Sequence, residues 1–130
     1  MWRELSNTFV LFLTDVEEVR HEIMKLKNGK SPGYDHITND ILKSVVGAII
    51  EPLTHVINLS FSKGIFPSQL KTAKVVPIHK AGDPTLFSNY RPISLLPSIS
   101  KIFERLVHTR LHKFISLNRK QRTTNDEVFK

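Results

Sequence analysis

In the first third of the chain, apolar residues recur every three or four positions, which is typical of one buried helix face. The residues of this run are Val16, Val19, Ile23 and Leu26. Thr14 and Glu17 stand at the spacing of a capping box, and Gly29 follows an asparagine, as at many helix ends. The pattern predicts a helix over residues 15–27.

A second, longer apolar run follows a loop rich in glycine and proline. Thr38 or Asn39 is predicted to cap its helix, and the dense apolar content after them predicts burial on most sides. Pro52 suits the first turn of a helix better than its middle. We therefore expect a break or kink at 47–52, followed by another helix that Gly64 ends.

The middle of the chain changes to a strand-like pattern rich in β-branched residues. After one helical turn at 68–71, residues 74–80 and 90–96 are predicted to form two strands. Pro77 lacks an N–H donor, which places the first strand at an edge or a bulge. The polar loop at 81–89 joins the strands, so they are expected to pair as an antiparallel ribbon.

Helical periodicity returns in a last helix, which Ser98 or Ser100 is expected to cap and which should end near Phe114. The tail at 116–130 is polar and weakly periodic, so it is expected to be frayed or disordered. The predicted fold class is therefore α+β, with three to four helices and a two-stranded antiparallel ribbon.

Composition restricts the function classes. The 130 residues favour one domain, and the lack of cysteine excludes disulfides and thiolate metal sites. No apolar run approaches the ~20 residues that span a bilayer, and the N-terminus lacks the features of a signal peptide. We therefore expect an intracellular protein with no membrane partner, although no residue pattern identifies a compartment.

The net charge of +7 is unevenly distributed along the chain. Residues 1–65 carry 7 Lys and Arg against 8 Asp and Glu, whereas residues 66–130 carry 12 against 4. A basic second half favours a polyanionic partner such as nucleic acid or a nucleotide phosphate. A solvated basic surface explains the same charges equally well.

Two cations occupy the predicted mouth of the ribbon. Lys80 ends the first strand and Arg91 begins the second, so antiparallel pairing brings them to the same end. A lysine supplies a mobile point charge and an arginine a planar fork that matches phosphate oxygens. The pair could hold a triphosphate, or both could be exposed charges of an edge strand.

The last helix carries further positive charge on its predicted outer surface. These residues are Lys101, Arg105, His108, Arg110 and Lys113. They could contact a nucleic-acid backbone, where each neutralised phosphate releases a counterion. A plain solvated helix face is the alternative.

Other candidate sites fail on chemistry. The Gly-Lys-Ser at 29–31 lacks the earlier glycine of a phosphate-binding loop, because Met24 occupies that place. His108 and His112 could share a helix face, but two histidines alone do not make a metal site. The aspartates are scattered, whereas a two-metal centre needs clustered carboxylates. We predict neither a catalytic residue nor a metal site.

Two stretches, "LKNGKSPGYDHITNDILK" and "KTAKVVPIHKAGDPTLFSNYRPISLLPSISKIFERLVHTRL", carry a specific resemblance. With the spacing between them, they resemble the start of reverse transcriptases from non-LTR (LINE-type, jockey-like) retrotransposons. The resemblance covers residues 14–115 and implies the fingers part of that fold. Residues 1–13 then form an N-terminal extension, and residues 116–130 a divergent tail.

The resemblance also implies roles for particular residues. Lys80 and Arg91 stand where family members carry the fingers cations that hold the triphosphate of the incoming nucleotide. Lys74 is a further candidate for contact with phosphate or template, as are Lys101 and Arg105. The implied partners are RNA or DNA and a deoxynucleotide, together with the palm and thumb.

The chain departs from the family pattern after the last helix. A "QFGFR"-like motif is missing, and the palm aspartates that bind magnesium in the complete family enzyme are absent. We therefore expect a truncated RNA-directed DNA polymerase fragment that is inactive alone, has no cofactor of its own and retains nucleotide or nucleic-acid binding. The alternative is a non-catalytic helical module that binds a protein partner.

Overall fold

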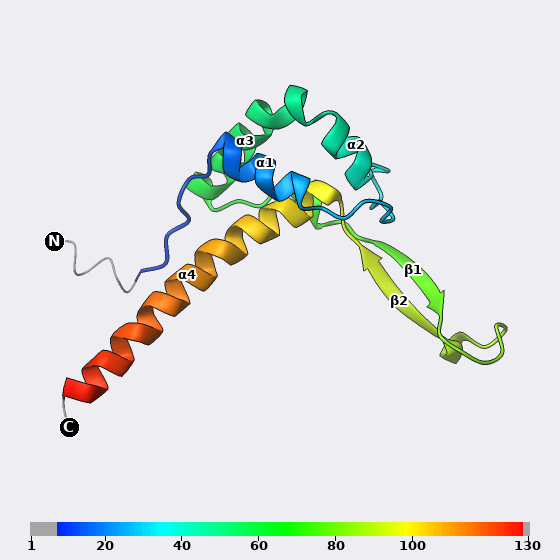
Figure 1. The fold of residues 1–130 in the computed structure, drawn as a ribbon. Helices are drawn as coiled ribbons and strands as arrows, with labels where there is room; N and C mark the ends of the chain where they lie inside the picture. The colour runs from blue at the N-terminus through cyan, green and yellow to red at the C-terminus, as the bar shows by residue number, and fades with distance from the viewer. Residues whose placement is uncertain (1–7, 129–130) are drawn as a thin grey trace.

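The computed structural model describes the backbone of residues 8–128 and the side chains as far as Arg119 (Figure 1). Its elements in chain order are α1 (Val16–Met24), α2 (Asn39–Ser44), α3 (Val46–Lys63), the 3-10 turn η2 (Ser68–Lys71), β1 (Lys74–His79), the 3-10 turn η3 (Phe87–Asn89), β2 (Tyr90–Leu95) and α4 (Ser98–Val128). The two strands form one antiparallel sheet. The α+β class predicted from the sequence is therefore confirmed.

The elements are arranged as a helical body with two projections (Figure 1). The body consists of α1, α2, α3 and the first half of α4. The β1–β2 ribbon leaves the body at one end, and the second half of α4 leaves it at the other. Within the described residues, no helix is both long enough and apolar enough to span a bilayer.

The core lies where α1, α2, α3 and α4 meet, and the apolar faces of these helices supply it. Its most buried members are Val19, Ile23, Leu42, Ile57, Ile102, Phe103 and Leu106. The ring of Phe103 meets the edges of Phe61 and Phe66, with centroids 6.5 and 5.4 Å apart. Such edge-to-face contacts add to the free energy gained by burying apolar area.

Several boundaries differ from the sequence prediction. The N-cap of α1 is Asp15, which accepts the N–H of Glu18 at 2.8 Å, so the predicted capping box is wrong. The break between α2 and α3 falls at Val45, and Pro52 lies inside α3. Gly64 ends α3 at φ 65°, as predicted.

The last helix is longer than its periodicity predicts. The end expected near Phe114 is wrong, because α4 is helical as far as Val128. Ser98 and Ser100 are buried, and their hydroxyls donate to Asn39 and to the carbonyl of Leu70. These contacts tie the start of α4 to two earlier segments.

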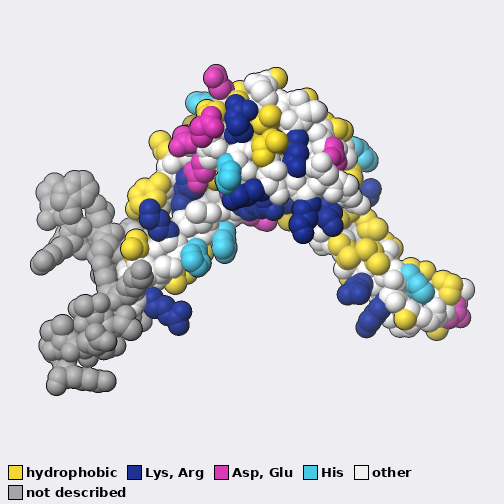
Figure 2. Space-filling view, in the orientation of Figure 1, with side chains coloured by type: hydrophobic (Ala, Val, Ile, Leu, Met, Phe, Trp, Pro, Cys, Tyr) yellow, Lys and Arg dark blue, Asp and Glu magenta, His cyan; other side chains and the backbone are white. Residues whose placement is uncertain are grey.

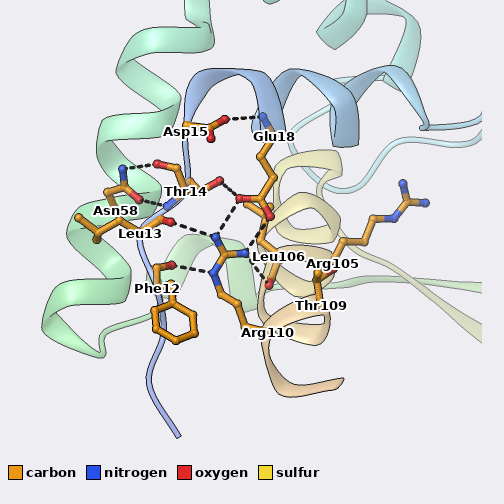
Figure 3. A network of polar contacts seen from close by, with 10 residues as sticks. All are labelled: Phe12, Leu13, Thr14, Asp15, Glu18, Asn58, Arg105, Leu106, Thr109 and Arg110. Atoms are coloured by element: carbon orange, nitrogen blue, oxygen red, sulfur yellow. Dashed lines mark hydrogen bonds and ion pairs between the residues drawn. The ribbon is translucent and has the colours of Figure 1, made fainter. Parts of the chain in front are cut away.

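Arg110 on α4 is the centre of a buried polar network (Figure 3). Its side chain is 8% exposed, and all five of its N–H donors have acceptors. Nη1 and Nη2 bond the two carboxylate oxygens of Glu18 at 3.0 and 2.8 Å. The remaining three donors reach the carbonyls of Phe12, Leu13 and Leu106 at 2.6–3.2 Å. The network therefore joins α4 to α1 and to the N-terminal segment.

Neighbouring groups extend this network. Thr14 and Asn58 of α3 exchange two hydrogen bonds at 2.7 and 2.9 Å. The Thr14 hydroxyl donates to Glu18, and the guanidinium of Arg110 lies 5.2 Å from the ring centroid of Phe61. Hydrogen bonds from Arg110 are the largest cause of the lowered pKa of Glu18, and burial opposes them.

A second constraint holds the base of the ribbon. Gly33 is buried against the junction of β2 and α4, where an added Cβ would lie 2.7 Å from the nitrogen of Pro97. Nearby, the hydroxyl of Tyr34 donates to the carbonyl of Gln69 at 2.8 Å. The loop between α1 and α2 therefore packs directly on the backbone from which the ribbon extends.

We predict that Gly33→Ala lowers the free energy of unfolding by about 2 kcal/mol, because the new methyl group must displace backbone. Urea denaturation measures this change. Gly47→Ala in α3 is the matched control, since nothing lies within 4 Å of its added Cβ and alanine favours a helix. Equal stability of the Gly33 variant and the original chain would contradict the close packing.

We predict that Arg110→Met lowers the free energy of unfolding by about 3 kcal/mol at pH 7, because it leaves Glu18 without its main partner. The folded-state pKa of Glu18 lies below its ordinary value of 4.5. The pair therefore stabilises the fold above pH 4.5, and this stability is lost as the pH falls through the lowered pKa.

The Arg110→Met chain should accordingly lose less stability than the original chain on acidification from pH 5 downwards. Urea titrations at several pH values measure the difference. Arg20→Met is the control, because the exposed pair of Arg20 with Glu17 is 3.8 Å long and should change stability by under about 0.5 kcal/mol. Parallel pH curves for the Arg110 variant and the original chain would show that the pair does not stabilise the fold.

Candidate nucleic-acid interface

The register of the ribbon decides which of its side chains share a face. Lys74 pairs with Leu95, Ile78 with Arg91, and His79 with Tyr90. The rings of His79 and Tyr90 lie 5.2 Å apart, as expected for opposed residues on one face. Residues two positions apart along a strand also share a face.

Lys80 follows β1 directly, and its N–H donates to the carbonyl of Asn89 at 2.7 Å. This bond continues the ladder by one step, so Lys80 lies on the face of Ile78 and Arg91. Lys80 and Arg91 are then diagonal neighbours, whose Cβ atoms are typically about 7 Å apart. Both residues are exposed. Figure 2 shows dark-blue side chains together on the ribbon.

Hydrogen bonds order the loop that separates the two cations. Asp83 accepts the backbone N–H and the hydroxyl of Thr85 at 2.8 and 2.7 Å, and these bonds lower its pKa. The side-chain amide of Asn89 donates to the carbonyl of Asp83 at 2.8 Å. The hydroxyl of Tyr90 donates to the carbonyl of Pro84, also at 2.8 Å. Gly82 turns the chain at φ 85°, a conformation that favours glycine. The loop thus holds the ends of both strands.

The other predicted contact residues do not join this pair. Lys74 lies on the same face but at the opposite end of β1, about 20 Å from Lys80 along the strand. Lys101 and Arg105 lie on α4, in the helical body and not at the ribbon mouth (Figure 1). The structure therefore separates the predicted contacts into a ribbon group and a helix group.

One predicted surface cation is buried. The helix periodicity assigns Arg110 to the outer surface of the last helix, but the residue lies in the network with Glu18, so this assignment is wrong. His108 and His112 do share a face, with ring centroids 6.0 Å apart, and both are exposed. Within the described residues, no three histidine or carboxylate side chains gather to hold a metal.

Sequence reasoning did not find that Glu22 of α1 and Lys25, the C-cap residue of α1, contribute to the charged surface beside α4. Together with Arg105, His108 and Thr109 they line an open groove between the two helices. Glu22 is paired with Lys25 at 3.4 Å and with Arg105 at 3.8 Å. The charge pattern of α1 predicts which side of this helix is exposed, but it does not predict which other helix lies beside that side.

Comparison with known proteins identifies the class to which this arrangement belongs. The chain is 41% identical over 113 residues to a probable RNA-directed DNA polymerase from transposon X-element of Drosophila melanogaster. It is 40% identical over 97 residues to the RNA-directed DNA polymerase from mobile element jockey, and 40% over 105 residues to the probable one from transposon BS, both of the same species. No family model matches the chain.

These alignments cover 86%, 74% and 80% of this chain but only 12%, 11% and 12% of the relatives. The chain is thus a homologue of one segment of retrotransposon RNA-directed DNA polymerases. Its relatives are RNA-directed DNA polymerases from jockey-like and other non-LTR retrotransposons, and the resemblance inferred from its motifs is confirmed.

Magnesium is the metal that the family resemblance implies, and among the described residues no three histidine or carboxylate side chains gather in a way that could hold it. Asp15 caps α1, Asp35 accepts the N–H of Ile37, and Asp40 accepts the N–H of Gly29. Asp83 is bound to Thr85 within its loop. Each is engaged locally, and no two of these bonds bring carboxylates to a common point. Asp126 lies outside the described side chains.

Proposed function

We propose that this segment supplies nucleotide and nucleic-acid contacts for template-directed DNA synthesis and does not itself carry out the phosphoryl transfer. The main support is the ribbon mouth, where Lys80 and Arg91 share one exposed face. The homologues are polymerases whose substrates carry phosphate. In the described part of the chain, no cluster of acidic side chains offers a metal site for the chemical step.

The chemistry of the pair suits a triphosphate. The guanidinium of Arg91 can donate two parallel hydrogen bonds to phosphate oxygens, and the ammonium of Lys80 can follow a neighbouring phosphate as a mobile charge. A Cβ separation of about 7 Å leaves room for adjacent phosphates between the two side chains. The ordered loop keeps the strand ends in place and so reduces the entropy lost on binding.

The remaining cations are proposed to contact a nucleic-acid strand. Lys74 lies on the same ribbon face as the pair, and Lys101 and Arg105 lie on α4. These cations lie away from the ribbon mouth, so they suit the extended backbone of a nucleic-acid strand better than they suit a single nucleotide. Each such contact would make binding weaker as salt rises, because neutralised phosphates release counterions.

The ribbon also carries apolar side chains between its cations, including Val76, Ile78 and Ile93. Isolated two-stranded ribbons are marginally stable in water. We propose that the palm and thumb of a complete polymerase, the parts that the resemblance implies, would cover such faces.

A protein-binding role is the second candidate. A groove of about 280 Å³ near the end of α3 is lined by Val56, Leu59, Ser60, Lys63, Ile65 and Pro67. Three of these apolar side chains are exposed, which favours contact with another apolar surface. This role requires neither Lys80 nor Arg91, so nucleotide binding separates the two candidates.

We predict that Lys80→Gln with Arg91→Gln weakens binding of a fluorescent deoxynucleoside triphosphate at least tenfold, about 1.4 kcal/mol, because both phosphate partners are removed. Fluorescence anisotropy measures the affinity. Lys74→Gln removes a cation from the same face but away from the mouth, and it should change the affinity by under about twofold. A similar loss in both variants, or none in either, would refute the assignment of the pair.

We also predict that the 130-residue chain does not extend a primer on an RNA template in the presence of magnesium. The reason is the lack of clustered carboxylates among the described residues. A gel-based primer-extension assay, with a complete reverse transcriptase as positive control, measures the product. Template-dependent extension by this chain would show that the segment carries out the phosphoryl transfer itself, contrary to the proposal.

A further inference from the structure

The groove between α1 and α4 has the properties of a separate binding site. It has a volume of about 470 Å³, opens to solvent and is lined by Glu22, Lys25, Arg105, His108 and Thr109. Figure 2 shows dark-blue and cyan side chains gathered where α1 crosses α4. In Figure 3, Arg105 extends from α4 away from the buried network around Arg110. Arg105 therefore lies in the groove and takes no part in the hydrogen bonds of Arg110.

The charges in the groove are only partly neutralised. The carboxylate of Glu22, whose side chain is 13% exposed, faces the two cations Lys25 and Arg105. Their side chains are 53% and 43% exposed, and the separations of 3.4 and 3.8 Å are long for charge-assisted bonds. One carboxylate against two accessible cations leaves net positive charge. Both cations can therefore reach an incoming anion while Glu22 keeps them near each other.

The groove continues as a stripe along α4. Lys101, Arg105, His108 and His112 stand at spacings of four, three and four residues, which places them on one helix face. Eleven residues of helix cover about 16 Å, so the stripe is linear and longer than one phosphate group. The imidazole rings of His108 and His112 lie 6.0 Å apart at 26°, and both are exposed. The stripe thus presents cations at one end and flat rings at the other.

We propose that this groove binds the backbone of a single-stranded nucleic acid, with a phosphate between Lys25 and Arg105 and bases or sugars against the two histidine rings. Cations beside flat rings are the combination that binds single strands, because phosphates need charge and unpaired bases stack. The proposal rests on the proposed function in assigning nucleic acid to this segment. It extends the strand contact proposed for Lys101 and Arg105 to a groove that also includes Lys25, and this groove lies away from the ribbon mouth.

The first test neutralises the cations of the groove in the full 130-residue chain. Lys25→Gln with Arg105→Gln should weaken binding of a fluorescein-labelled 12-nucleotide single strand about tenfold. It should also reduce the slope of log K against log salt by about 0.7, because the proposal places one phosphate between the two cations. Lys63→Gln at the end of α3, outside this groove, should change neither quantity appreciably. Circular dichroism confirms that each variant is folded.

The second test removes a negative charge from the groove and is expected to strengthen binding. Glu22→Gln keeps the shape of the side chain but removes its negative charge, so it should tighten binding of the same strand about threefold. Glu51→Gln on α3 makes the same change in net charge away from the groove and should have less effect. Weaker binding by the Glu22 variant, or an effect equal to that of Glu51→Gln, would overturn the proposal.

Ligand comparisons complete the experiment. Single-stranded RNA and DNA should both bind more tightly than a duplex of equal length, because paired bases cannot reach the histidine rings. His108→Ala with His112→Ala should remove this preference. Equal binding of the duplex, or of an acidic peptide of equal charge, would overturn the assignment to single strands. The triphosphate affinity of the Lys25 and Arg105 variant should equal that of the original chain, so failure of this groove is distinguishable from failure of the ribbon site.

Discussion

The fold depends on one buried guanidinium. Arg110 lies on α4, yet its five N–H donors end on the carboxylate of α1, on two carbonyls of the segment before α1 and on a carbonyl of its own helix. A buried charge is tolerated only when its partners replace the lost water, and here every donor has a partner. Within the described residues, no buried side-chain nitrogen or oxygen lacks a hydrogen bond. The same contacts set the position of α1 on α4, and so the width of the charged groove between them.

The ribbon depends on a different kind of constraint. It projects from the helical body (Figure 1), so its orientation must be set at its base. Gly33 allows the preceding loop to touch the backbone at Pro97, and the buried hydroxyl of Ser98 reaches Asn39 at 2.6 Å. At the far end, local hydrogen bonds order the loop between the cations. The ribbon is thus held at its base and closed by an ordered loop at its far end, while most residues on its two faces are exposed.

Within the described side chains, two exposed groups of cations lie apart from each other. One is the ribbon mouth with Lys80 and Arg91, and the other is the face of α4 beside α1. A short, ordered pair of cations suits a compact phosphate ligand, whereas a linear stripe suits an extended backbone. Both ligands are proposals that rest on the similarity of the chain to retrotransposon RNA-directed DNA polymerases.

Local pattern alone determined the helices, the strands and their antiparallel pairing, because 3.6- and 2-residue periodicities and turn residues act over a few positions. The placement of Lys80 and Arg91 at the same end of the ribbon follows from the same local rules, whereas their shared face depends on the register that the structure gives. The burial of Arg110 does not follow from local rules either, since its periodicity resembles that of an exposed cation until Glu18 and two carbonyls surround it. Lys25 and Arg105 lie in the same groove only because α1 packs beside α4, since the two residues are 80 positions apart in sequence. Sequence determines which face of a helix is polar, but only tertiary contact determines what that face meets.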